Sequence, residues 1–248
     1  MNKPIYRILK TLFLSVLLSA VLAASSAAGE NAAYAAVGDS LFFGRYPQTR
    51  EGTDLTPIEW TVLDVRDGKL LLLSKCGLDM KTYHENDDYV TWETCSLRTW
   101  LNSSFLETAF TPEEQAAILL TEVDNSAAQH YAGWKQPGGE NTLDRIFLLS
   151  YGEANRYLDL VYHGAYSVKA RMQPTAYAVQ AGAWAMDEIL TADRKVTGWW
   201  LLRSPGSFRG QAACVNNGGS LSDCHFTSVT GCVRPALWLS SGMDAEQE

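Results

Sequence analysis

The chain has 248 residues, of which 46% are hydrophobic and 19% are charged, and its formal net charge at pH 7 is -8. This composition is typical of a globular protein and excludes a largely disordered or membrane-embedded one. The acidic balance also argues against nucleic acid as a partner and against binding to an anionic membrane by charge alone.

Residues 1–36 carry the pattern of a secretory signal peptide followed by a short linker. Lys3, Arg7 and Lys10 form a basic start, and the apolar run over 12–24 is too short to span a bilayer comfortably. Small residues follow this run, as they do before a signal-peptidase cleavage site. We therefore expect a secreted or cell-surface protein with no membrane span after cleavage; an uncleaved N-terminal anchor is the alternative.

Residues 37–240 are long enough for one domain with a sizeable core, and 241–248 form a polar tail. The domain opens with strands. LFFGRYP predicts a strand followed by a proline turn, and PIEWTVLDVRDGKLLLLSK predicts two strands joined at the hairpin dipeptide Asp67–Gly68. The run LLLLS indicates a strand that is buried on both faces.

Helices follow these strands. Apolar residues at helical spacing predict a helix over 97–106, capped by Thr94 or Ser96. A second helix start shows a cap, a first-turn proline and a capping-box glutamate: Thr111, Pro112 and Glu114.

The polar, glycine-rich stretch over 125–142 predicts a long loop. RIFLLS is a strand or the lead-in to a helix in GEANRYLDLV. Four short strands end the chain: WWLLRS, QAACV, SLSDCHF and GCVRPALWL. Strands, then helices, then a block of strands favour an α+β fold over alternating βαβ units.

The chain contains five cysteines, so at least one thiol stays free. Export permits disulfides, and Cys214 can pair with either Cys224 or Cys232. No CxxC occurs and the four histidines are scattered, so we expect no metal site and no other cofactor.

Two arginines interrupt apolar, aromatic runs that otherwise predict buried strands. Arg203 lies in GWWLLRSPG and Arg234 in GCVRPALWL. Arginine is almost never fully buried unless it is paired, so each of these residues has either a dedicated partner or a role at a ligand.

Five blocks occur in a fixed order: TWETCSLRTWLN, AFTPEEQAAI, RIFLLS, WWLLRSPG and GCVRPALWL. Together they resemble a bacterial family of exported or surface domains of unknown function, common in gut-associated Firmicutes, and the resemblance covers roughly 37–240. That family is similar to the C-type lectin-like fold of formylglycine-generating enzymes and retroelement variable proteins. The resemblance implies a single C-type lectin-like α+β domain that closes with an antiparallel strand block.

The resemblance places Arg203 and Arg234 on neighbouring strands of the closing sheet. In a structural role, their heads would pair with carboxylates such as Asp64, Glu93 or Asp144. In a functional role, they would form the floor of a ligand cleft, with 206–231 as the binding surface.

The candidate ligand-binding residues come from three places: the long loop, the two arginines and the segment between them. Trp134 either stacks on a sugar or protein partner or pins its own loop to the core. The segment 206–231 has the composition of an adaptable binding surface, and also that of plain hairpin turns. The full set is Trp134, Arg203, Phe208, Arg209, Asn216, Asn217, Asp223, His225 and Arg234.

Catalytic motifs are missing from the sequence. No GxSxG accompanies the histidines, and the compact pair of copper-binding thiols used by formylglycine-generating enzymes is absent. We therefore expect a secreted, non-catalytic module that binds an extracellular protein or carbohydrate. The alternatives are an oxidase of the formylglycine-generating type and a structural module of the cell envelope; the oligomeric state stays open.

Overall fold

The computed structural model describes residues 35–86, 89–162, 166–190, 195–222, 228 and 230–241, with backbone only for 186–190. Two five-stranded sheets contribute to one hydrophobic core. The first sheet has the order β1 (Ser40–Tyr46), β2 (Thr56–Arg66), β3 (Lys69–Ser74), β16 (Ala236–Ser240) and β8 (Ile146–Phe147). The second has the order β14 (Leu221–Ser222), β13 (Ala212–Val215), β12 (Trp200–Pro205), β15 (Thr230–Val233) and β5 (Asp79–Thr82).

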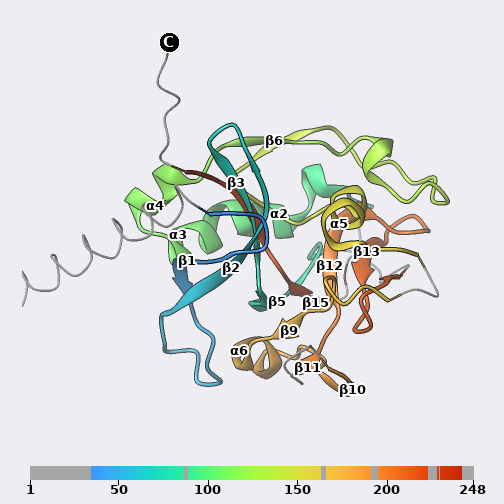
Figure 1. The fold of residues 1–248 in the computed structure, drawn as a ribbon. Helices are drawn as coiled ribbons and strands as arrows, with labels where there is room; N and C mark the ends of the chain where they lie inside the picture. The colour runs from blue at the N-terminus through green and yellow to red at the C-terminus, as the bar shows by residue number, and fades with distance from the viewer. Residues whose placement is uncertain are drawn as a thin grey trace, which may run out of the picture.

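Short helices and two-stranded ribbons surround the sheets (Figure 1). The ribbons are β4 (Cys76–Gly77) with β9 (Gln173–Pro174), β6 (Thr121–Val123) with β7 (Thr142–Asp144), and β10 (Met186–Leu190) with β11 (Val196–Thr197). The helices include α4 (Pro112–Ala117), α5 (Tyr151–Leu158) and α6 (Ala176–Gln180), and α5 lies beside β12. The domain is strand-rich and mixed, in agreement with the α+β prediction. The closing strand block is not wholly antiparallel as expected, because β12 pairs with β15 in parallel.

The predicted hairpin between β2 and β3 is confirmed. Asp67 and Gly68 have φ values of 49° and 66°, as a two-residue turn with positive φ at both positions requires. Every residue of β3 after Lys69 is buried, as the continuous apolar run indicated. Trp60 of β2 and Leu72 of β3 are fully buried in the core.

The first predicted helix is present but begins differently. The 3-10 turn η1 (Trp92–Thr94) leads into α2 (Ser96–Trp100), which continues through the π-helical turn η2 (Leu101–Phe105) into α3 (Leu106–Ala109). The cap is Cys95, whose Sγ accepts from the Arg98 amide at 3.4 Å. The prediction of Thr94 or Ser96 as cap is wrong, because one lies in the preceding turn and the other is already helical.

The second helix start is confirmed. The Glu114 amide donates to Thr111 Oγ1 at 3.3 Å, and the Thr111 amide donates to Glu114 Oε2 at 2.8 Å. Pro112 occupies the first turn, where its missing N–H removes no helical hydrogen bond.

The closing segment GCVRPALWL is two strands instead of one. β15 ends at Val233 in the second sheet, and β16 begins at Ala236 in the first. Pro235 between them has no N–H to donate to a ladder, so pairing is interrupted there and the chain crosses from one sheet to the other. Arg234 therefore lies at the junction of the two sheets. Among the described residues, no helix is both long and apolar enough to cross a membrane.

Candidate functional site

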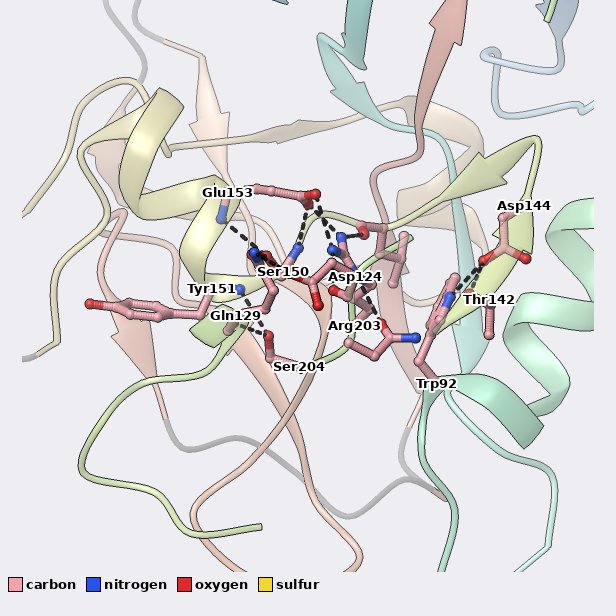
Figure 2. A network of polar contacts seen from close by, with 12 residues as sticks. Trp92, Asp124, Gln129, Thr142, Asp144, Ser150, Tyr151, Glu153, Arg203 and Ser204 are labelled. Atoms are coloured by element: carbon pink, nitrogen blue, oxygen red, sulfur yellow. Dashed lines mark hydrogen bonds and ion pairs between the residues drawn. The ribbon is translucent and has the colours of Figure 1, made fainter. Parts of the chain in front are cut away.

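Arg203 uses all five of its N–H donors inside the protein (Figure 2). Nε donates to Asn125 Oδ1 at 3.1 Å, Nη1 to the Leu148 carbonyl at 2.8 Å and Nη2 to the Asp124 carbonyl at 2.9 Å. The other Nη1 and Nη2 donors form a bidentate pair with the Glu153 carboxylate. Only 1% of the Arg203 side chain is exposed. Arg203 therefore has no donor left for a ligand.

The Arg203 network joins β12 to the first turn of α5 and to the segment that follows β6. Ser150 caps α5 through a capping box with Glu153, so the carboxylate that holds Arg203 also closes the helix start. Next to Arg203, Ser204 Oγ donates to the Gln129 carbonyl and accepts from the Tyr151 amide, both at 2.9 Å. The Tyr151 ring points away from this network (Figure 2). The network is thus a rigid floor made of three segments distant in sequence.

The three carboxylates suggested as arginine partners have other roles. Asp144 accepts from Arg98 Nε at 2.6 Å and from Trp92 Nε1 at 2.9 Å. Asp64 accepts from a tyrosine hydroxyl, and Glu93 accepts from the Glu140 amide at 3.2 Å. Glu153 was missed as the partner of Arg203, although the capping pattern Ser–x–x–Glu at 150–153 would have placed it at a helix start.

A pocket of about 340 Å³ lies above this floor. One side is the face of the first sheet, and the other is formed by α5 and the 121–129 segment. The side chains on the sheet are Arg66, Leu71, Phe147 and Trp238. The opposite wall consists of Thr121, Glu122, Val123, Asp124, Ala128, Gln129, Gly152, Glu153, Arg156 and Tyr157. Charged and hydrogen-bonding groups thus predominate over aromatic and aliphatic ones.

Two arginines at this pocket lie over aromatic rings. The guanidinium carbon of Arg66 is 4.5 Å from the centre of the Trp238 ring, and that of Arg156 is 5.1 Å from the Tyr157 ring. Tyr157 in turn donates its hydroxyl to Asp64 at 2.8 Å, and burial together with this carboxylate raises the pKa of Tyr157 to about 12. Cation–π contact orients both guanidinium groups without consuming their N–H donors.

Two carboxylates lie on the 121–129 segment. Asp124 accepts from the Ser126 amide at 2.8 Å and from Gln129 Nε2 at 3.1 Å, and the Ser126 contact lowers the pKa of Asp124. Glu122 accepts from Asn141 Nδ2 at 3.2 Å. Both carboxylates are held by neutral groups, so their negative charge remains available to a ligand.

The structure places Trp134 in an aromatic cluster under its own loop. Its ring centre is 5.5 Å from Tyr131 and 5.6 Å from Tyr162, and the residue is 9% exposed. Of the two roles considered for Trp134, pinning the loop to the core is the one that this geometry supports.

Of the predicted residues after Arg203, those that the structure describes do not line the pocket. Phe208 is exposed, and Arg209 lies over the ring of exposed Tyr89 at 4.0 Å. Asn216 organises a hairpin turn, because its Oδ1 accepts from the Gly218 and Ser220 amides. Asn217 is half-buried in that turn, whereas Asp223 and His225 lie outside the described residues.

Arg234 is buried where the two sheets meet. Its Nε donates to the Ser74 carbonyl at 2.9 Å, and its guanidinium lies 5.0 Å from the centre of the Trp200 ring. Within the described part of the chain, Nη1 is a buried atom with no hydrogen-bond partner. Burial lowers the pKa of Arg234 to about 10. A carboxylate partner was expected for both arginines; Arg203 has one in Glu153, whereas no carboxylate of the described chain forms an ion pair with Arg234.

The cysteines divide into free and bonded forms. Cys76, Cys95 and Cys232 are free thiols, so the suggested pairing of Cys214 with Cys232 is wrong. Cys214 is disulfide-bonded, and Cys224 lies outside the described residues, so their pairing stays a prediction. Burial raises the pKa of all three free thiols, and that of Cys95 to about 12.

The fold and the pocket together define a strand-rich domain with a charged, partly aromatic cavity over an internal ion-pair network. Across the described ranges, no group of three histidine, cysteine, aspartate or glutamate residues could hold a metal ion. Residues 67–241 match a family described as Domain of unknown function (DUF6273). The match covers more than half of the chain, so the chain belongs to this family. No curated protein and no solved structure matches it.

Proposed function

We propose that this protein is a secreted, non-catalytic module that binds an extracellular protein segment or carbohydrate in the pocket above Arg203. The supporting observation is the pocket itself, which combines oriented charged groups with aromatic rings over a fixed floor. Binding sites are concave, largely preformed and carry a few placed polar groups. Export, inferred from the pattern of residues 1–36, supplies the extracellular setting. We retain the C-type lectin-like fold as part of this proposal, on the resemblance of the five sequence blocks.

The lining supports binding more than catalysis. None of the residues that line the pocket is a serine, cysteine or histidine, so the lining holds no serine or cysteine nucleophile with a histidine base. Glu153 is committed to Arg203, and Asp124 has a lowered pKa, which is the wrong direction for a general acid at neutral pH. The alternative of a copper oxidase has less support, because the compact pair of copper-binding thiols used by formylglycine-generating enzymes is absent from the sequence.

The test is a binding screen with a matched pair of variants. Ala127 and Ala128 are adjacent and exposed, but only Ala128 lines the pocket. The mature chain is screened against a glycan array and a peptide array, and hits are titrated by calorimetry. Ala128→Trp should weaken a pocket ligand more than tenfold, whereas Ala127→Trp should leave its affinity unchanged.

Two results would overturn the proposal. One is a set of hits whose affinity is the same in Ala128→Trp and in the original chain. The other is turnover of a screened compound that Ala128→Trp abolishes, which would make the pocket an active site.

A further inference from the structure

The pocket presents opposite charges from different elements. Arg66 ends β2 and Arg156 lies on α5, and neither side chain makes a hydrogen bond with another described residue; Arg66 has a loose ion pair with Asp64 at 3.9 Å. Glu122 lies on β6, and Asp124 follows it. No lysine or arginine of the described chain forms an ion pair with either of these two carboxylates. A ligand that pairs with both the arginines and the carboxylates must carry both signs of charge.

Strand pairing gives an approximate distance between Arg66 and the acidic residues of the 121–129 segment. Arg66 belongs to β2, which is followed in the sheet by β3 and β16, and Ile118 pairs with Leu239 on the far side of β16. The acidic segment continues from Ile118, so it lies three strand spacings from β2, or roughly 14 Å between backbones. Side chains reach into this gap from both sides, which leaves the charged heads closer than the strands. Two or three extended residues span about 7–10 Å.

The Glu153 carboxylate and the Arg203 guanidinium neutralise each other, so this pair adds no net charge to the pocket. Arg66 and Arg156 lie beside the hydrogen-bonded pair of Tyr157 and Asp64. Glu122 and Asp124 lie on the 121–129 segment, three strand spacings from β2. The hydroxyl groups of a neutral sugar can hydrogen-bond to the two arginines and to these two carboxylates, but they neutralise none of the four charges. A peptide with free termini would place its single carboxylate at the two arginines and its single ammonium group at the two carboxylates, and arginine forks are suited to a carboxylate.

We propose that the pocket takes a short zwitterionic peptide, its carboxylate held by Arg66 and Arg156 and its ammonium group by Glu122 and Asp124. This inference rests on the proposed binding function and narrows its ligand class. It also assigns each end of the peptide to its own pair of side chains, so each end can be tested separately.

The experiment compares one peptide in three forms. Tri-alanine and a random tripeptide mixture are titrated into the mature chain with free termini, with an acetylated N-terminus and with an amidated C-terminus. Either block should weaken binding at least tenfold. Arg156→Gln should weaken binding of the free and acetylated forms but leave the amidated form unchanged, and Glu122→Gln should spare only the acetylated form. Arg50→Gln, which removes an exposed arginine outside the pocket, should change none of these affinities.

The outcomes separate this inference from the broader proposal. If blocking the termini has no effect, or if methyl glucoside binds in competition with the peptide and at least as tightly, the zwitterionic ligand is wrong. If glycans bind in a manner sensitive to Ala128→Trp while no tripeptide binds, the inference fails and the binding function stands. If no probe responds to Ala128→Trp, both fail.

Discussion

At the scale of single residues, the Arg203–Glu153 pair is the strongest internal interaction of the site. Glu153→Gln keeps the shape of the side chain but leaves the Arg203 charge without its counterion. Removing one partner of a fully buried pair costs 3–5 kcal/mol; because 25% of the Glu153 side chain is exposed, we expect about 2 kcal/mol of lost unfolding free energy. Urea unfolding measures the loss, and Glu51→Gln at an exposed turn is the control, with less than about 0.5 kcal/mol expected. Equal losses in the two variants would contradict the role of this pair.

Replacing each buried arginine by methionine should cost much more stability at Arg203 than at Arg234. Arg203→Met would leave a carboxylate and three other acceptors without their donor, and we expect a loss of about 3 kcal/mol or more. Arg234→Met leaves only the Ser74 carbonyl without that donor and also removes a buried guanidinium whose Nη1 is unsatisfied. Its unfolding free energy should therefore stay within about 1 kcal/mol of the original. Guanidinium chloride unfolding of both variants measures the two losses of unfolding free energy. A larger loss for Arg234→Met than for Arg203→Met would show that Arg234 has a partner that this geometry lacks.

At the scale of elements, we expect acid to destabilise the loop after β6 through His130. This histidine is 9% exposed, and burial lowers its pKa, with the Arg203 charge acting in the same direction and Asp124 against it. The unfolded chain binds a proton near pH 6.5, whereas the folded chain binds it only at lower pH. The contribution of His130 to stability is therefore complete above about pH 6.5 and is lost as the pH falls below that value.

The variant His130→Gln should remove this part of the pH dependence. We expect the original chain to lose more unfolding free energy between pH 7.5 and pH 5 than the variant does, as measured by urea unfolding at both values. His84→Gln is the control, because His84 lies elsewhere and accepts from the Ser96 amide. An identical pH dependence in the original chain and His130→Gln would exclude a titrating role for His130.

Local signals in the sequence predicted local structure well. The Asp67–Gly68 hairpin and the Thr111 capping box depend on neighbouring residues, so their patterns are visible in the sequence. The split of GCVRPALWL into β15 and β16 depends on which sheet each half joins. Pro235 is the one residue of this segment whose chemistry indicates a break in strand pairing. The pocket was not predicted, because its lining comes from β2, β6, α5 and β16 and no short motif contains it.

At the scale of the whole molecule, the buried arginines explain how two sheets and one pocket form a unit. Arg234 lies where the chain passes from the second sheet to the first, and Arg203 reaches from the second sheet to α5 and the 121–129 segment. The predicted binding residues Phe208 and Arg209 follow β12, and the pocket lies over the face of the first sheet. The aromatic and charged groups of a candidate ligand site are thus on a different surface from the one that the composition of 206–231 suggested.

The state of the cysteines tests the whole fold and separates the binding function from the oxidase alternative. Cys76, Cys95 and Cys232 are free, and their thiols are buried or half-buried with raised pKa values. Because the thiolate is the reactive form, the folded protein should react slowly with a disulfide reagent at pH 7.5, at Cys76 before the others. Denaturation without reductant should expose three thiols, and reduction should raise the count to five.

Cys76→Ser should remove the earliest native reaction and lower the denatured count by one. A denatured count of one would mean two disulfides and would contradict the free state of two of the three cysteines Cys76, Cys95 and Cys232. Two thiols that react within seconds in the folded protein and are protected by copper would require a pair of thiolates that burial disfavours. That result would contradict the assignment of the pocket as the functional site and would favour the oxidase alternative over the binding function.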